Sequence, residues 1–364
     1  MQSSHLVKEL SEKSTWVLSP TVTIAIPALN EEKYIERVVR TFINSSSSNI
    51  LEILIADGGS TDGTVDIVKR LGEEDKRVKL LHNPYRYQSA ALNIMINNAK
   101  GELFLRADAH CEYSKDYVEN SIMEYLRTGA KNVGGAPRYI ATNEVQVGIA
   151  LAVRSFLGNG GAKHHDPDFQ GYSDTVSLGC YKTSELKKIK GFSLENVVNE
   201  DSELNLRLQN GNGRSIYVSK HIKFWYYPRS NFKSLFKQYF NYGRGRFITF
   251  RKHRNKVPNR SIAPFVFGVL FIAYLLFDLL YLNLTIWPPI IVGGLMAVAF
   301  TECAKTAVKT RGEFDRKIWR GNGNKIGLTS RIINCFVALQ IMVVGHFLGF
   351  GYQFLKSFRK NSGF

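Results

Sequence analysis

Cysteine is scarce in this chain. The 364 residues include four cysteines, at positions 111, 180, 303 and 335, and no two of them form a Cys-x-x-Cys pair. This spacing argues against a zinc site and against a disulfide framework. Isolated cysteines suit a reducing compartment.

An apolar signal-peptide core is also missing from the N-terminus. Residues 1–20 form a polar leader in which charged residues stand at positions 8, 9, 12 and 13. We therefore expect the N-terminal domain to stay on the cytoplasmic side of a membrane.

Acidic residues are few relative to basic ones. Lys and Arg number 48 against 31 Asp and Glu, a net charge of +17. Such an excess indicates a polyanionic partner. No zinc-finger spacing, basic zipper or aromatic RNA-binding signature is present, so we expect no nucleic acid partner.

One segment concentrates the positive charge. Residues 228–260 contain ten Lys or Arg and no Asp or Glu. The segment directly precedes a long apolar run, and basic clusters at the cytoplasmic end of a membrane helix are attracted to anionic head groups. We interpret it as an interfacial segment that contacts membrane lipids.

Three apolar runs occupy the membrane region that we expect at residues 261–364. They cover about 263–284, 286–304 and 332–355, and about 20 residues suffice to cross a hydrocarbon core of roughly 30 Å. A buried soluble helix is the alternative, but Asp278 is the one charge in the first run of 22 residues. We expect an integral protein of the cell or plasma membrane with two to three transmembrane helices.

The loop between the second and third runs, residues 305–331, is rich in Lys and Arg and should be cytoplasmic. Two crossings before this loop agree with a cytoplasmic N-terminal domain. A third crossing would carry the basic tail at 356–360 to the other side. The third apolar run can therefore either cross the membrane or re-enter it from the same side.

Short apolar strands alternate with amphipathic helical stretches between residues 21 and 255. The strands are expected at 21–26, 50–56, 78–81 and 103–105, with Pro27 ending the first one. This alternation predicts an α/β domain with a mostly parallel central sheet and right-handed crossovers. Ligands bind beyond the carboxyl ends of such strands, where Asn30, Asp57 and Asp108 stand.

Asp57 is followed by two glycines, which let a ligand approach the carboxylate without obstruction. Its oxygen can accept the N–H of a uracil ring. The alternative is a helix cap, a role that Asp62 fits better because Gly63 and Thr64 begin the next helix.

Asp108 and His110 stand two residues apart, so in extended chain they point the same way. A carboxylate and an imidazole can hold Mg²⁺ or Mn²⁺ against a diphosphate, and imidazole favours Mn²⁺. A short Asp-x-His motif also occurs as an ordinary surface pair.

Glu200 and Asp201 open a helix with apolar positions. Acids at this place are favoured by the helix dipole alone. The functional interpretation is a general base, Asp201, that removes a proton from an acceptor hydroxyl.

The segment at residues 237–246 combines Gln238 with tyrosines and the arginines Arg244 and Arg246. Arginine suits bidentate phosphate binding. The other interpretation is a basic amphipathic helix on lipid, and one helix can serve both roles.

The motifs resemble those of the family 2 inverting glycosyltransferases, which have a GT-A fold. They are residues 27–32 (Pro-Ala-Leu-Asn-Glu-Glu), 57–64 (Asp-Gly-Gly-Ser-Thr-Asp-Gly-Thr), 108–110 (Asp-Ala-His), 199–201 (Asn-Glu-Asp) and 238–244 (Gln-Tyr-Phe-Asn-Tyr-Gly-Arg). The resemblance covers about residues 20–250, so we expect the catalytic domain at 21–255. Residues 86–93 and the Tyr-Gly-Arg-Gly-Arg ending are most similar to the succinoglycan-biosynthesis type, which extends polyprenyl-diphosphate-linked oligosaccharides.

The resemblance implies a role for each matching position. Asp201 would be the catalytic base with Glu200 beside it, and Asp108 and His110 would hold the metal. The expected donor-binding residues are Pro27, Asn30, Glu31, Asp57, Gln88, Asp108, Gln238, Arg244 and Arg246. The expected donor is UDP-glucose or another UDP-hexose, and the expected acceptor is a polyprenyl-diphosphate-linked or other lipid-linked saccharide.

Two departures from the family pattern qualify these expectations. His110 replaces the second acid of the Asp-x-Asp motif, which leaves the metal open between Mg²⁺ and Mn²⁺. The Gln-x-x-Arg-Trp motif of processive synthases is absent, since Asn241 and Tyr242 stand in its last two places. We therefore predict transfer of one sugar per acceptor.

Three rival functions remain at this stage. A polyprenyl-monophosphate glycosyl synthase would load the sugar directly on a lipid phosphate. A sugar-nucleotide nucleotidyltransferase would use a similar sheet without membrane segments. A non-catalytic membrane scaffold would have no need of Asp57, Asp108 and Asp201 together.

Overall fold

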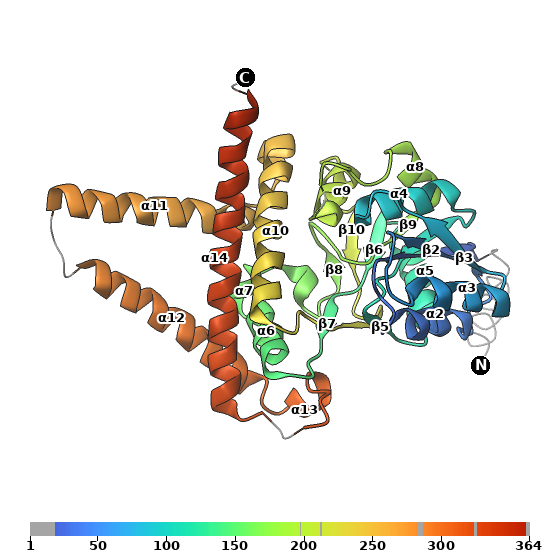
Figure 1. Ribbon diagram of the computed structural model, residues 1–364, viewed down its shortest axis with the longest axis horizontal. Coiled ribbons are helices and arrows are strands. Elements are labelled where there is room, and N and C mark those ends of the chain that lie inside the picture. The colour runs from blue at the N-terminus through green and yellow to red at the C-terminus, as the bar shows by residue number, and fades with distance from the viewer. Residues whose placement is uncertain (1–18, 197, 212, 283–286, 324–325, 362–364) are drawn as a thin grey trace, which may run out of the picture.

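The computed structural model describes residues 19–361 except 197, 212, 283–286 and 324–325. Apart from residues 19 and 20, the predicted leader lies outside the described residues. An α/β domain forms one end of the molecule, and two apolar helices project from the other end (Figure 1).

A large mixed sheet forms the centre of the α/β domain. In the described residues its eight strands follow the order β3 (Val78–His82), β2 (Ile50–Asp57), β1 (Val22–Ala28), β4 (Leu103–Arg106), β9 (Cys180–Lys182), β6 (Asn132–Gly134), β10 (Ile216–Val218) and β8 (Gly171–Tyr172). The first four strands are parallel, as are β6 and β10, while β9 and β8 run antiparallel to their neighbours. The predicted mostly parallel sheet is confirmed.

Helices cover both faces of this sheet because side chains of each strand alternate between the two faces. One face packs against α2 (Ile35–Ile43), α3 (Thr64–Glu74) and α5 (Tyr117–Thr128). The other packs against α4 (Gln88–Asn98), α8 (Thr183–Lys188) and α9 (Glu200–Gln209). In β1, for example, Ile24 and Ile26 belong to the first core and Ala25 to the second.

Strand β1 continues one residue past Pro27, so the prediction that this proline ends the strand is wrong. Pro27 pairs with Ala56 of β2. On its other side, the pairing of β1 with β4 ends at Ala25. The N–H that proline lacks is therefore not needed there, and proline is tolerated.

A three-stranded sheet connects the α/β domain to the apolar helices. It has the order β5 (Cys111–Tyr113), β11 (Phe224–Tyr226) and β7 (Pro137–Tyr139). Strand β7 leads to α6 (Glu144–Arg154), α7 (Phe156–Asn159) and a 3₁₀ turn at Lys163–His165, while β11 leads to α10 (Phe232–His253). Short 3₁₀ turns at Arg254–Lys256 and Asn259–Ser261 follow α10.

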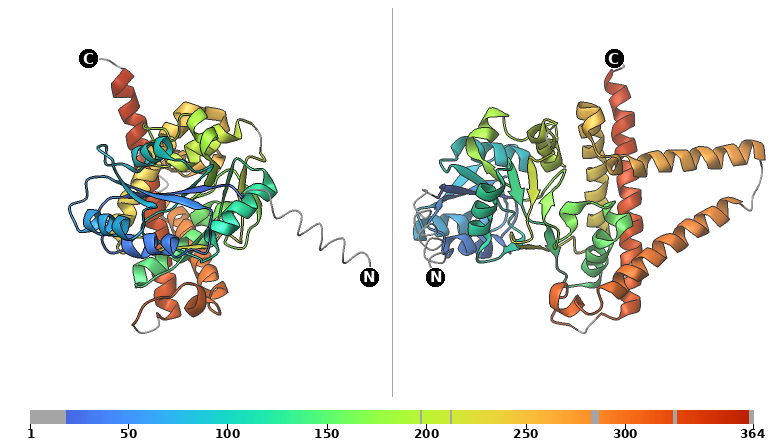
Figure 2. Two further views of the ribbon diagram at one scale, coloured as in Figure 1. Left: turned by 90° about the vertical axis from the view of Figure 1, so that its right-hand side faces the viewer. Right: turned by 180° about the vertical axis from the view of Figure 1, so that it is seen from behind.

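The C-terminal region consists of α11 (Ala263–Phe277), a π-helical turn (Asp278–Leu282), α12 (Trp287–Lys309), the short α13 (Phe314–Lys317) and α14 (Leu328–Asn361). Among the described residues, three segments are long and apolar enough to cross a membrane: Ala263–Tyr281, Trp287–Lys309 and Leu328–Phe358. Figure 2 shows α11 and α12 projecting away from the α/β domain, whereas α14 lies between them and α10.

Helix α14 packs along its length on α6 and α10. Glycines allow this close approach: a Cβ at Gly349 would lie 1.9 Å from the carbonyl oxygen of Phe240, and one at Gly148 would lie 2.3 Å from that of Asn334. The opposite side of α14 exposes apolar side chains, including Ile333, Val344 and Leu348. Helix α14 therefore has one face on the protein and one apolar face without a protein partner among the described residues.

The basic loop after α12 docks on the α/β domain. The N–H of Ala141 donates to the carbonyl of Ile318, and the N–H of Arg320 donates to the carbonyl of Ala141, both at 2.8 Å. The hairpin of α11 and α12 thus begins and ends beside the same domain.

Candidate active site

The sequence predicts a site at the carboxyl ends of β1, β2 and β4, and the residues that follow β4 line a cavity there. Asp57 ends β2 opposite Ala28 of β1, and Asp108 follows β4 on the other side of β1. A cavity of about 500 Å³ opens beside β4 and extends to α10, α11 and α14.

Arg106 is the centre of this site. Arg106 is the last residue of the apolar strand β4, and its side chain is 4% exposed. It donates from Nε to Asp108 Oδ1 at 3.1 Å, from Nη1 to Glu200 Oε1 at 3.1 Å, and from Nη1 to Asp201 Oδ1. One cation therefore joins the end of β4 to the first turn of α9.

The carboxylates keep Arg106 charged. Burial by itself lowers the pKa of Arg106, but Asp108, Asp201 and Glu200 together raise this pKa well above its usual value. A buried cation in reach of three acids is stable only because each of them compensates its desolvation.

Asp201 has the environment of a general base. Its side chain is 23% exposed at the cavity. Burial raises the pKa of Asp201 to about 7; Arg106 opposes this rise, and the charges of Glu200 and Asp108 add to it. A base of this pKa is ionised near neutral pH and still accepts a proton readily.

Asp108 is held by two side chains of the same cavity. Gln88, at the start of α4, donates from Nε2 to Asp108 Oδ1 at 3.2 Å. Arg106 also contacts Oδ1, and its contact with Oδ2 is longer, at 3.5 Å. Oδ2 is therefore the oxygen that is more open to a ligand.

His110 faces Glu31 from the loop after β1. Its Nδ1 lies 3.3 Å from Glu31 Oε1. Burial lowers the pKa of His110, but the hydrogen bond to Glu31 and the charge of Asp108 outweigh burial and raise this pKa. Metal-binding histidines commonly donate one ring N–H to a carboxylate in this way, which leaves the other nitrogen for the metal.

The donor set of Asp108 and His110 fits a divalent cation. Within the described residues, no three His, Cys, Asp or Glu side chains converge on one point. Mg²⁺ sites in enzymes that act on nucleotides typically take one or two protein ligands and complete their shell with substrate phosphates and water. Two protein ligands therefore suffice for an ion that binds together with a diphosphate.

Helix α10 brings two of its three predicted residues to the cavity. Gln238 and Arg246 line it. Arg244 does not; its Nε lies 3.4 Å from Gln353 Oε1, and its guanidinium lies over the ring of Tyr352, both on α14. Donor binding by Arg244 stays a prediction, and the structure places it away from the other site residues.

The loops after β1 and β2 are joined to each other. Asn30 has a left-handed φ of 57°, and its Oδ1 accepts the N–H of Thr61 at 2.8 Å. Asp57 is 5% exposed and accepts the N–H groups of Gly59 and Ser60. Neither residue lines the cavity, and neither does Pro27 within β1, so their donor-binding roles stay predictions.

Gly63 occupies the N-cap position of α3, so the interpretation of Asp62 as the cap is wrong by one residue; Asp62 directly precedes the N-cap. Its Oδ1 accepts the N–H of Thr64, the first residue of α3, at 3.1 Å.

Arg106 and Tyr113 also belong to the site, although neither has a role among the predictions from the sequence. The Tyr113 hydroxyl bonds to both the N–H and the carbonyl of Asp108, at 2.6 and 3.0 Å. The sequence could have indicated Arg106, because it is a charged residue that directly follows the apolar run 103–105 and stands two positions before Asp108. Nothing in the sequence indicates Tyr113, since its contact with Asp108 depends on the turn between β4 and β5.

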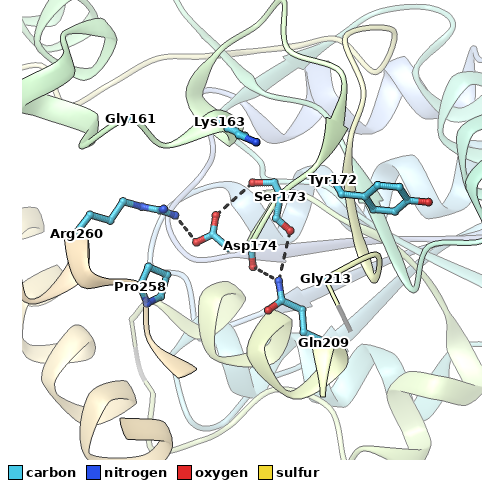
Figure 3. A pocket seen from close by; sticks show the side chains of 9 residues that line it. All are labelled: Gly161, Lys163, Tyr172, Ser173, Asp174, Gln209, Gly213, Pro258 and Arg260. Carbon is cyan, nitrogen blue, oxygen red and sulfur yellow. Dashed lines mark hydrogen bonds and ion pairs between the residues drawn. The ribbon is translucent and has the colours of Figure 1, made fainter. Parts of the chain in front are cut away.

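A second cavity of about 390 Å³ adjoins the first and shares Arg260 with it. Figure 3 shows Arg260 reaching toward Asp174, with Ser173 and Gln209 beside it. Asp108, Glu200 and Asp201 do not line this second cavity, so the chemistry belongs to the first.

Known proteins resemble this chain in sequence. The family model "Glycosyl transferase family 2" matches residues 23–174. The succinoglycan biosynthesis protein ExoA of Rhizobium meliloti is 38% identical over 259 residues, which cover 69% of this chain and 78% of ExoA. The dolichyl N-acetyl-α-D-glucosaminyl phosphate 3-β-D-2,3-diacetamido-2,3-dideoxy-β-D-glucuronosyltransferase of Methanococcus voltae is 32% identical over 240 residues, 64% of this chain and 74% of that enzyme.

The fold has a known counterpart as well. The mannosyltransferase PcManGT of Pyrobaculum calidifontis, solved with GDP-Man and Mn²⁺, superposes with a TM-score of 0.51 at 17% identity. The match covers 91% of this chain and 88% of that one. This likeness concerns the fold, and the predicted GT-A fold is confirmed.

Arg106→Met tests the central ion network. We expect a loss of about 3–5 kcal/mol in the free energy of unfolding, because the buried Glu200 and the partly buried Asp108 and Asp201 lose their shared cation. Thermal or denaturant unfolding in detergent measures the loss. The control is Arg70→Met, whose surface pair with Glu36 is half-exposed and is worth at most about 1 kcal/mol. Equal small losses in both variants would show that Arg106 is not the centre of the site.

Proposed function

The chain belongs to glycosyltransferase family 2, and from this premise we propose that it transfers one hexose from a UDP-sugar to a lipid-linked saccharide at the membrane surface. The observation that carries the proposal is the cavity itself. It has the Arg106 network at one end and residues of α11 and α14 at the other. A sugar donor and a membrane-bound acceptor can meet in such a cavity.

Asp201 is proposed as the base that removes the proton from the acceptor hydroxyl. The resulting oxygen attacks the anomeric carbon from the side opposite the nucleotide, and the bond to the diphosphate breaks. One in-line displacement inverts an α-linked donor to a β-linked product. Arg106 holds the Asp201 carboxylate in place through the ion pair between them, and Glu200 contributes by raising the pKa of Asp201.

Asp108 and His110 would hold Mg²⁺ or Mn²⁺, and the ion would supply Lewis-acid stabilisation to the departing diphosphate. Glu31 orients the His110 ring through the contact at Nδ1. Gln88 and Arg106 fix the Asp108 carboxylate, so its Oδ2 keeps one direction. Such preorganisation is the main contribution of protein groups to this kind of catalysis.

The named relatives support the class of acceptor. ExoA is named for succinoglycan biosynthesis, and the Methanococcus voltae enzyme is named for transfer to a dolichyl-linked sugar phosphate. By analogy, we propose that this protein acts in the synthesis of an exopolysaccharide or cell-surface glycan and that its acceptor is attached to a polyprenyl phosphate or diphosphate.

We further propose that the chain crosses the membrane twice, through α11 and α12, with the catalytic domain in the cytoplasm. The loop that follows α12 contacts Ala141 of the catalytic domain. Helix α14 packs on α6 and α10, and α10 carries too many charges to enter the bilayer. Helix α14 would therefore lie along the surface with its apolar face in the lipid.

Asp201→Asn tests the reaction. Removing the base should lower turnover by about 10²- to 10⁴-fold while UDP-sugar binding persists. Purified protein in detergent is incubated with labelled UDP-glucose, UDP-galactose, UDP-N-acetylglucosamine or GDP-mannose, a membrane lipid extract and Mn²⁺ or Mg²⁺. Label entering the organic phase is counted.

The chemistry of the labelled product separates the rival functions. Mild acid breaks the bond between a sugar and a lipid phosphate but leaves a glycosidic bond intact, so we expect it to release the label as part of an oligosaccharide. Release of the label as a free monosaccharide would instead identify a polyprenyl-monophosphate glycosyl synthase. Undiminished turnover of the Asp201 variant would refute the assignment of the base.

The pH dependence of kcat/KM provides an independent test of Asp201. The base works in its ionised form, and its pKa is raised to about 7. Activity should therefore fall about tenfold per unit as the pH drops below 7 and level off above it. Glu200→Gln removes a charge that raises the pKa of Asp201, so the activity of this variant should rise at a lower pH than that of wild type. Identical pH profiles for the two proteins would contradict the effect of Glu200 on Asp201.

Cysteine labelling tests the membrane topology. Single cysteines replace Glu73, Trp287, Gly323 and Phe358 in turn, all of them exposed, and intact cells are treated with an impermeant maleimide. We expect labelling at Trp287→Cys alone, because the other three positions lie on the cytoplasmic side; lysed cells should label at all four. Labelling of Phe358→Cys in intact cells would show that α14 crosses.

A further inference from the structure

The cavity has a second polar region near the apolar helices, separate from the carboxylates. It consists of His164 and His165 from the 3₁₀ turn after α7, Arg246 of α10 and Arg260 before α11. We call these four residues the basic cluster. All four line the cavity.

Arg246 carries a positive charge with little compensation. Its Nη1 donates to Ser261 Oγ at 3.1 Å, and among the described residues it forms no ion pair. Burial and the neighbouring Arg260 lower the pKa of Arg246 to about 10. An arginine in such surroundings is stabilised by any anion that enters the cavity.

The two histidines differ in their partners: His165 Nδ1 lies 3.4 Å from the Tyr139 hydroxyl, whereas His164 has an unsatisfied ring nitrogen. His164 is 7% exposed, and its Nδ1 has no hydrogen-bond partner among the residues that the structure describes. The ring centroids of His164 and His165 lie 4.3 Å apart. Burial, then the adjoining ring and arginines, lower the pKa of His164 well below its usual value. A buried polar atom without a partner is costly unless a ligand satisfies it.

Arg260 is the member that already has an anion. It forms an ion pair with Asp174, as Figure 3 shows from the side of the second cavity. Gly160 lies against its side chain, with a left-handed φ of 60° that brings the loop after α7 close to it. Asp174 thus holds Arg260 at the border of the two cavities.

Apolar side chains adjoin the basic cluster on the membrane side. Pro264, in the first turn of α11, lines the cavity together with Leu339, Met342 and Val343 of α14. Arg260 and Ser261 immediately precede α11 in the chain. The basic cluster therefore lies where the first proposed membrane helix begins.

We infer that the basic cluster binds the phosphate or diphosphate of the lipid-linked acceptor, with the first units of the lipid chain passing over Pro264, Leu339 and Met342. This inference rests on the proposed function. Arginine and histidine donors match phosphate oxygens, and a charged head with an apolar tail matches a cluster bordered by apolar side chains at the start of a membrane helix.

The same donors would also accept the diphosphate of the nucleotide sugar, the role that the sequence analysis predicts for Arg246. The diphosphate of the donor and the phosphate of the lipid need different surroundings. The donor diphosphate is expected beside Asp108 and His110, where a metal can bridge it. Among the described residues, the carboxylate that contacts the basic cluster is that of Asp174, and it is already paired with Arg260. The lipid phosphate is therefore the occupant that the structure favours.

Binding measurements on the purified full-length protein in detergent test the inference with three probes: geranylgeranyl diphosphate, geranylgeraniol and UDP. The variants are Arg246→Gln and His164→Gln, with Arg246→Lys as the conservative replacement. Arg251→Gln is the matched control, because Arg251 is an exposed arginine on the same helix. Thermal unfolding of each variant verifies that it is folded.

We expect wild type to bind the diphosphate lipid more tightly than the alcohol. Arg246→Gln and His164→Gln should each weaken binding of the diphosphate lipid by about tenfold, the usual effect of losing a charge-assisted hydrogen bond. UDP binding should not change, Arg246→Lys should restore part of the affinity, and Arg251→Gln should behave as wild type.

Two results would overturn the inference. One is weaker UDP binding in the cluster variants with unchanged binding of the diphosphate lipid, which would make the cluster a donor site. The other is equal affinity for geranylgeraniol and geranylgeranyl diphosphate. Failure of the proposed function is a separate result, since it would appear as absence of UDP binding and of Asp201-dependent transfer in wild type.

Discussion

The site depends on the Arg106 guanidinium. It is buried at the end of β4 and interacts with Asp108, Glu200 and Asp201, which come from two segments more than 90 residues apart. Desolvation would make such a cation unstable alone, and the three acids would repel one another without it. Their mutual compensation fixes the start of α9 against the sheet. It also sets the basicity of Asp201, since Arg106 lowers the pKa that burial and Glu200 raise.

Charge is divided within the cavity. The carboxylates and His110 lie at the carboxyl edge of the sheet, whereas Arg246, His164 and their neighbours lie beside α11 and α14. The acidic end suits a metal and a base, and the basic end suits an anion that arrives without a metal. The two substrates of the proposed transfer would make these two demands, because the donor needs its diphosphate activated and the phosphate of a lipid-linked acceptor needs only to be held.

The apolar helices serve two different purposes in this arrangement. Helices α11 and α12 project from the protein with few buried side chains, as segments in lipid do (Figure 1). Helix α14 instead packs on α6 and α10 through close glycine contacts, and its residues Leu339 and Met342 form part of the cavity wall. The predicted third apolar run is thus a structural part of the site, whichever way the chain is placed in the membrane.

Much of this protein follows from the sequence alone. The alternation of apolar runs determined the four parallel strands β1 to β4 and the helices between them, because burial on both faces of parallel strands demands that pattern. The spacing of Asp108 and His110 and the acids at 200 and 201 predicted site residues that the fold brings to one cavity, because polar residues at strand ends and helix starts are local features. Tertiary structure decided the rest. Arg106 gains its role only when β4 and α9 meet. Arg244 and Arg246, two positions apart on α10, face about 200° apart, and only the packing of α14 determines which one reaches the cavity. The length of an apolar run likewise cannot tell a helix that crosses lipid from one that lies on its own domain, because both bury the same kind of side chain.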